Sequence, residues 1–207
     1  ETGFDRSAVP DGSYENFALK ATITDPDGVK ITSVNGAPVV ATSGLSNTSA
    51  IRFGRLGLTN VNGSELMNMS VRATTEYWKN GVGFVTNIDD NCTVIDSASI
   101  KLQNAQGGLN TGNMPSNNLI AAPLSFTAGQ SVIVVKKPTT TPATKGSVDI
   151  CVDLGIDNPV LCSSATPTTM PWLQGKWSGS AYDDDPGARA TFGVFKSGPI
   201  VYLREIY

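Results

Sequence analysis

Any chemistry in this chain has to run on carboxylate, lysine, tyrosine or cysteine side chains, because the sequence contains no histidine. Histidine is the commonest general base and transition-metal ligand, and it completes the usual serine and cysteine nucleophile pairs. Glu65, Glu76 and Glu205 could supply a carboxylate pair for glycoside hydrolysis, but their spacing along the sequence does not give their separation in space. We therefore expect a protein that is not an enzyme.

Two acidic clusters offer ligands for a cation: Asp183, Asp184 and Asp185, and the pair Asp89 and Asp90. Calcium prefers several carboxylate and carbonyl oxygens gathered on a loop, and loops between strands provide that arrangement. Neither cluster has the glycine and terminal glutamate of the EF-hand loop. Turn aspartates also accept hydrogen bonds from their own backbone. Calcium is thus the one cofactor the sequence leaves open, with solvated turn aspartates as the other interpretation.

Aromatic residues gather beside the first acidic cluster, where Trp172, Trp177 and Tyr182 follow one another closely. Ring faces next to carboxylates are what a sugar-binding surface needs, because the rings stack on pyranose C–H groups. Tryptophans of a β-sandwich are also commonly buried between strands, and we expect burial here. The alternative is a carbohydrate-binding module, with or without calcium, that uses Trp172, Trp177 and the three aspartates.

The composition is that of a weakly charged extracellular β-protein. Charged residues make up 16% of the chain and hydrophobic residues 40%, and the net charge is -3. Glycine, asparagine, serine and threonine supply the polarity, as they do in loops built from turn-forming residues. Nucleic-acid binding would need a basic patch, and the net charge gives no sign of one. No apolar run reaches the roughly 18 residues of a membrane span. We expect neither nucleic-acid binding nor a membrane-spanning segment.

Three cysteines are present, and two of them flank a turn signal. Cys151 and Cys162 lie on either side of Asp157, Asn158 and Pro159, which suits a disulfide that closes a loop. Such a bond would stabilise the fold by about 2–3 kcal/mol. Two buried thiols are the other interpretation, and the state of Cys92 depends on which cysteines pair.

Alternating apolar and polar residues predict strands almost everywhere, and no segment has a helical period. The clearest alternation or apolar runs lie in residues 17–24, 29–34, 49–61, 66–78, 98–104 and 131–137. Residues 131–137 form a continuous apolar run that predicts a central strand. We expect an all-β protein, an antiparallel β-sandwich of about ten to twelve strands, with two subdomains as a variant.

Residues 1–3 look like a remnant of recombinant expression, and residues 4–207 are expected to form one sandwich domain. This domain would be the C-terminal piece of a larger secreted protein. Residues 191–196 and 200–207 predict a closing hairpin around a Ser-Gly-Pro turn.

Arg55 follows Ile51 and Phe53 on one face of an alternating segment, where a buried arginine would need a partner. An aspartate of the loop before Cys92 could provide it. We expect one structural ion-pair network that seats the closing hairpin, formed by Arg55, Asp89, Asp90, Arg189, Arg204 and Glu205. Replacing Arg204 by alanine should then destabilise the domain.

Two blocks of the sequence, residues 53–93 and 182–207, carry a resemblance to a known family. The matching motifs, in order and spacing, are Gly54-Arg55-Leu56, Gly63-Ser64-Glu65-Leu66, Glu76-Tyr77-Trp78, Gly83-Phe84-Val85, Asp89-Asp90 with Cys92-Thr93, residues 188–193, and Tyr202 with Arg204-Glu205. With these motifs the chain resembles the C-terminal domain of MshQ-like proteins, which are encoded with mannose-sensitive haemagglutinin type IV pili. Residues 105–145 have no counterpart in the family.

The resemblance implies a Gram-negative bacterial protein that is extracellular, at the cell surface or associated with the pilus. It implies a non-enzymatic module that mediates surface adhesion or attachment to pilus components. Its partners would be pilus subunits or a ligand on a host or cell surface, a glycan included, together with the upstream domains of its own chain. Most of the motif residues are expected to be structural.

Overall fold

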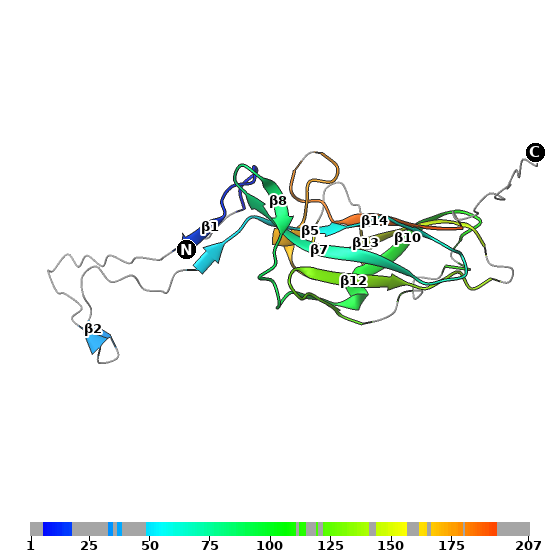
Figure 1. Cartoon of the computed structure of the whole chain (residues 1–207), viewed down its shortest axis with the longest axis horizontal. Coiled ribbons are helices and arrows are strands. Elements are labelled where there is room, and N and C mark those ends of the chain that lie inside the picture. Colours follow the sequence, from blue (N-terminus) through cyan, green and yellow to red (C-terminus); the bar gives the residue numbers. More distant parts are fainter. Residues whose placement is uncertain are drawn as a thin grey trace, which may run out of the picture. The chain divides into compact units, whose positions relative to one another are not determined.

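The computed structural model describes residues 6–17, 33–34, 37–38, 49–110, 112–114, 119, 122–140, 144–156, 162–164, 167–179 and 181–193. Their regular elements are β1 to β14 and the short 3-10 turns η1 (Ser97–Ser99) and η2 (Pro171–Leu173) (Figure 1). The all-β prediction is confirmed. Four of these strands, β2, β3, β9 and β11, have only two residues, which explains why the strands outnumber our expectation. Within these ranges no helix has the length and apolar character needed to cross a membrane.

The chain divides into two compact units, Glu1–Phe53 with Trp78–Gly83, and Gly54–Tyr77 with Phe84–Tyr207. In the first unit β1 (Tyr14–Phe17) pairs antiparallel with β4 (Ser49–Ile51), and β2 (Ser33–Val34) pairs with β3 (Ala37–Pro38). Arg52 forms an ion pair with Glu15 at 2.9 Å, and the Arg6 guanidinium lies 4.3 Å from the centre of the Phe53 ring. Among the described residues, the sandwich belongs to the second unit.

Two main sheets build the second unit, and each is named here after a strand inside it. The β7 sheet has the order β12-β7-β5 with β8 on β7; its strands are β5 (Gly54–Leu58), β7 (Met69–Lys79), β8 (Gly83–Thr86) and β12 (Gln130–Val135). The β13 sheet has the order β10-β13-β14-β6; its strands are β10 (Ile100–Gly107), β13 (Gly146–Val152), β14 (Gly187–Phe192) and β6 (Val61–Gly63). A small pair, β9 (Val94–Ile95) with β11 (Leu124–Ser125), completes it.

The inward faces of both sheets meet in one apolar core. In β7 every second residue from Met69 to Thr75 is buried, and the intervening residues are exposed or half-buried. This is the period of a strand with one face against a core. The buried residues of both sheets form a single cluster, which includes Leu56, Val71, Ile133, Val135, Val148, Ile150, Ala188, Ala190 and Phe192. The second unit is therefore a β-sandwich, and β7, β12 and β14 run lengthwise through it (Figure 1).

Its strand pairs are antiparallel, except that β14 runs parallel to β6. The exception arises at a corner, where β5 ends at Leu58 in the β7 sheet and β6 begins at Val61 in the β13 sheet. Only Thr59 and Asn60 connect the two sheets there, and the Thr59 N–H donates to the Arg72 carbonyl at 3.0 Å. This corner places Asn60 beside β14.

Two expectations about individual segments are wrong. The run 131–137 does not form a central strand, because β12 lies at one end of its sheet and Val132 is half exposed. Arg55 does not point into the core, because its neighbour Leu56 is fully buried and successive side chains of a strand point to opposite faces. The imperfect alternation of residues 49–61 concealed which face was inward.

A disulfide joins Cys151 of β13 to Cys162, which confirms that prediction. The loop it closes has a sequence separation of 11 residues. Cys92 is a free and exposed thiol.

Candidate functional site

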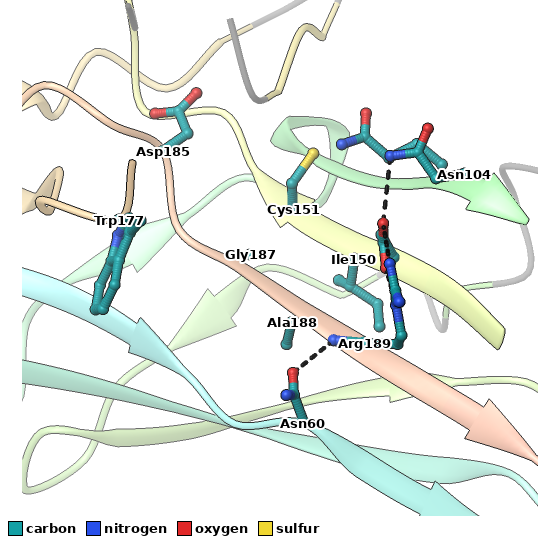
Figure 2. A pocket seen from close by; sticks show the side chains of 11 residues that line it. Asn60, Asn104, Ile150, Cys151, Trp177, Asp185, Gly187, Ala188 and Arg189 are labelled. Carbon is teal, nitrogen blue, oxygen red and sulfur yellow. Dashed lines mark hydrogen bonds and ion pairs between the residues drawn. The ribbon is translucent and has the colours of Figure 1, made fainter. Parts of the chain in front are cut away.

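A groove of about 440 Å³ lies on the outer face of the β13 sheet. Its lining combines strand residues with two loop residues and one residue of the corner: Gln103, Asn104, Asp149, Ile150, Cys151, Gly187, Ala188, Arg189, Trp177, Asp185 and Asn60. Figure 2 shows Trp177 on one side and Arg189 with Asn104 on the other, with Gly187 and Cys151 between them. Pockets for small ligands span roughly 300–1,000 Å³, so the groove has the size of a binding site.

The floor of the groove follows from the register of β13 and β14. Asp149 lies directly opposite Arg189, and Cys151 lies directly opposite Gly187. These residues take alternate positions on the outer face, while Ala188 and Ala190 are buried beneath them. Gly187 leaves the floor open, and a Cβ there would meet the Ile150 carbonyl at an ordinary 3.5 Å. The groove is therefore deeper because the residue at position 187 is a glycine, which has no side chain to fill the floor.

A polar cluster occupies the far end of the groove. The Arg189 guanidinium donates to both carboxylate oxygens of Asp149, at 2.7 Å and 3.1 Å. The Asn104 side-chain amide donates to the same carboxylate at 3.2 Å. Hydrogen bonding to Asp149, and then its charge, raises the pKa of Arg189 above its ordinary value. Asn60 completes the cluster, because its side-chain oxygen accepts from the Arg189 backbone N–H at 2.8 Å.

The near end is formed by residues 170–179, which we call the tryptophan loop. Within it the turn η2 presents Trp172, which is 55% exposed, and Trp177 is 41% exposed. The Trp177 indole packs directly over Gly175, where a side chain would collide with it. The expectation that these tryptophans are buried is wrong, because short loops outside the sheets carry them.

Two of the three consecutive aspartates, Asp184 and Asp185, hold the tryptophan loop in place. Asp184 is fully buried, and its carboxylate accepts from the Ser178 N–H at 2.6 Å. Its backbone exchanges two hydrogen bonds with Gly175, at 2.8 Å and 3.0 Å. Asp185, also buried, accepts from the Leu154 N–H at 3.0 Å and from the Gln174 side-chain amide at 3.1 Å. These carboxylates serve as backbone acceptors.

Calcium at this position stays a prediction, because the Asp183 Oδ1 and Asp184 Oδ1 atoms are buried and accept no hydrogen bond among the described residues. Asp184 and Asp185 direct oxygens to different segments, and Asp183 lies half-buried beside them. In the part of the chain that the structure describes, no three acidic, histidine or cysteine side chains are grouped as metal ligands. Asp184 and Asp185 accept backbone hydrogen bonds as turn aspartates do, but both are buried, so the interpretation of these two residues as solvated is wrong.

Arg55 lies on the outer face of the β7 sheet, under aromatic rings. Its guanidinium donates to Glu76, directly opposite on β7, at 2.7 Å. The same group lies 3.7 Å from the centre of the Phe84 ring and 4.8 Å from that of Trp177. Tyr182 extends this cluster, with its ring 6.1 Å from that of Phe84. Arg55 therefore supports one side of the tryptophan loop.

The expected ion-pair network is divided among separate contacts. Arg55 pairs with Glu76 and Arg189 with Asp149, because the strand register sets these residues opposite each other. Arg204 and Glu205, and most of the closing hairpin, lie outside the described residues.

Asp90 stabilises its own loop. Its carboxylate accepts from the backbone N–H groups of Cys92 at 3.3 Å and Thr93 at 3.0 Å. Burial alone would raise the pKa of Asp90, but the hydrogen bonds outweigh burial and the pKa is lowered. Asp89, its neighbour, is exposed.

Sequence reasoning missed four polar residues of the groove, namely Asn60, Gln103, Asn104 and Asp149. One signal was present, because Asp149 is a charged residue between the apolar residues Val148 and Ile150. In an alternating strand that position faces outward, where a charge is available to a ligand. Gln103 and Asn104 lie far from it in sequence and meet it through the pairing of β10 with β13, whereas the corner brings Asn60 beside Arg189.

A family model supplies the relationship of this chain to other proteins. The model of the fourth domain of DUF6701 matches residues 52–206. The chain therefore belongs to the DUF6701 family, and residues 52–206 correspond to the fourth domain of that family. No curated protein and no solved structure is matched by the chain.

Proposed function

We infer that this DUF6701 fourth domain is a non-enzymatic binding module of a type IV pilus-associated adhesin or biogenesis protein. It acts at the cell surface, where it attaches its chain to pilus subunits or to another surface ligand. The observation that carries the proposal is the tryptophan loop, which presents Trp172 and Trp177 at 55% and 41% exposure. Large exposed aromatics are enriched where proteins bind partners.

The loop is organised before any partner arrives. Asp184 and Asp185 bind its backbone and that of the neighbouring Leu154, and the Arg55 guanidinium lies 4.8 Å from the centre of the Trp177 ring. A surface that is already ordered loses less conformational entropy on binding, so more of its contact energy appears as affinity. This arrangement favours a recognition role for the two tryptophans.

Two further observations favour the location. A disulfide between Cys151 and Cys162 is typical of proteins that leave the reducing cytoplasm. The motifs around Arg55, Glu76 and Asp90 resemble those of MshQ-like proteins of the mannose-sensitive haemagglutinin pilus system.

Binding to pili tests this function. The purified domain is passed over immobilised type IV pili of the mannose-sensitive haemagglutinin class, and its retention is measured. We expect retention of the unmodified domain and at least about tenfold weaker binding of the Trp172→Ala/Trp177→Ala variant, since tryptophans dominate many interfaces.

The matched control is Val132→Ala, which removes an exposed apolar side chain from β12, outside the tryptophan loop. This variant should bind as the unmodified domain does. Failure of the unmodified domain to bind the pili would contradict the attachment function, and equal weakening by Val132→Ala would contradict the role of the loop.

A further inference from the structure

We propose that the groove on the outer face of the β13 sheet binds a neutral hexose unit of a glycan, with Trp177 as its stacking platform. The inference rests on the proposed binding function and names the ligand class of one part of that surface. It differs from the carbohydrate site predicted from the sequence, because the aspartates at 183–185 do not form the polar end of the groove. That end is formed by Asp149 and Arg189, with Asn104 and Asn60.

The shape of the groove suits a flat ring. It has a volume of about 440 Å³, and Gly187 and Ala188 keep its floor low between the Trp177 ring and the polar cluster. A pyranose has one apolar face of C–H groups, which stacks on an indole, and a rim of hydroxyl groups. Although Arg55 and Gly175 contact the Trp177 indole, the residue stays 41% exposed, and a pyranose on its exposed part would direct its hydroxyl rim toward Arg189 and Asn104 (Figure 2).

The polar groups match hydroxyls because they combine donors and acceptors in fixed positions. Asp149 is held by Arg189 and Asn104, so its carboxylate keeps its orientation without a ligand. Asn60 uses its side-chain oxygen on the Arg189 backbone, so this hydrogen bond does not engage its two amide hydrogens, which are donors. A sugar hydroxyl both donates and accepts, so it can bridge such a carboxylate and such an amide.

The charges of the groove exclude an anionic ligand. Its lining contains two carboxylates, Asp149 and Asp185, and one guanidinium, Arg189. Arg189 is already engaged by both oxygens of Asp149, so its charge is neutralised within the pair. A phosphate, a sulfate or an acidic sugar would meet net negative charge, whereas a neutral sugar would not.

Ligand-detected NMR with defined sugars tests the proposal. The probes are methyl glucoside, methyl galactoside and N-acetylglucosamine as neutral sugars, and N-acetylneuraminic acid as the anionic one. We expect saturation transfer to at least one neutral sugar and none to N-acetylneuraminic acid. Absence of transfer to every neutral sugar at millimolar concentration, or binding of the anionic sugar alone, would overturn the proposal.

Three variants locate the site. Trp177→Ala removes the platform, and Gly187→Val fills the floor at a position where a Cβ is tolerated, so each should weaken neutral-sugar binding about tenfold or more. Val132→Ala is the control, because Val132 is an exposed apolar residue of β12 that lies outside the tryptophan loop and does not line the groove. Equal loss with Val132→Ala, or no loss with Gly187→Val, would place sugar binding elsewhere and overturn the assignment. Melting curves of all variants confirm that each is folded.

The pilus-binding and sugar-binding measurements distinguish failure of the proposed function from failure of this inference. A domain that binds pili but no neutral sugar retains the proposed function and loses this inference. A domain that binds a neutral sugar through Trp177 but no pili retains the groove and loses the pilus partner.

Discussion

Two arginine–carboxylate pairs stand on opposite sheets of the sandwich, and they differ in what covers them. Arg55 and Glu76 are direct neighbours across β5 and β7, with side chains 24% exposed each, and the Phe84 and Trp177 rings lie over the guanidinium. Arg189 and Asp149 are direct neighbours across β13 and β14, and the Arg189 side chain is 48% exposed beside the groove.

The same pairing geometry therefore serves two purposes. A covered pair is shielded from water and salt, so it contributes to the stability of the strands and loop around it. An exposed pair contributes little to stability, but it presents fixed polar groups to a ligand. The comparison predicts that mutations in the two regions affect different measurements.

The largest effect should come from removing the disulfide that supports the open region, since Cys151 lines the groove. The Cys151→Ala/Cys162→Ala variant should lose about 3 kcal/mol of unfolding free energy, because the unfolded chain gains the freedom of the opened loop. Chemical denaturation measures this loss. Cys92→Ala, at the free and exposed thiol, is the control and should change nothing. An unchanged midpoint in the double variant would show that the groove region needs no covalent support.

The covered pair should give the next largest effect. Arg55→Ala should lower the unfolding free energy by about 2 kcal/mol, because it removes an ion pair and two contacts with aromatic rings. Arg55→Lys should recover only part of the loss, since an ammonium group lacks the planar geometry of guanidinium. If Arg55→Ala melts at the temperature of the unmodified domain, the covered pair is not the stabilising member of the comparison.

The exposed pair should give a smaller effect on stability than on binding. Arg189→Ala should leave the melting temperature nearly unchanged, because exposed ion pairs contribute little. It should nevertheless weaken neutral-sugar binding, since Asp149 then loses the group that orients it. A melting temperature that falls as far as in Arg55→Ala would remove the distinction between the two pairs.

The smallest expected effect is the salt dependence of stability, which should differ between the two ion pairs. At about 1 M salt the screening length falls to about 3 Å, so exposed charges interact weakly while shielded contacts persist. The stability difference between Arg55→Ala and the unmodified domain should survive high salt, measured by denaturation in low and high sodium chloride. Any small difference for Arg189→Ala should vanish, and its survival would indicate that this pair is also shielded.

The sequence predicts the local part of this fold well. Alternation in β7 from Met69 to Thr75 identifies a strand with one buried face, and the spacing of Cys151 and Cys162 around a turn identifies the disulfide. Both signals lie within a short stretch of chain, where the period of side chains and the chemistry of turns decide the outcome.

Which residues face each other on neighbouring strands could not be predicted from the sequence. Arg55 could have met any of several carboxylates, and only the β5–β7 register selects Glu76. Arg189 meets Asp149 for the same reason, although 40 residues separate them. The exposure of Trp172 and Trp177 was hidden too, because the hydrophobicity of a side chain does not reveal whether its loop packs inside or outside the sheets.

The corner at Thr59 and Asn60 has a mechanical consequence. From Leu58 in one sheet to Val61 in the other the chain takes three Cα–Cα steps, which reach at most about 11 Å. This length is the limit to which the two sheets can separate beside the groove while the chain stays intact. Thermal opening of the sandwich beyond that limit must therefore begin at a place remote from Asn60.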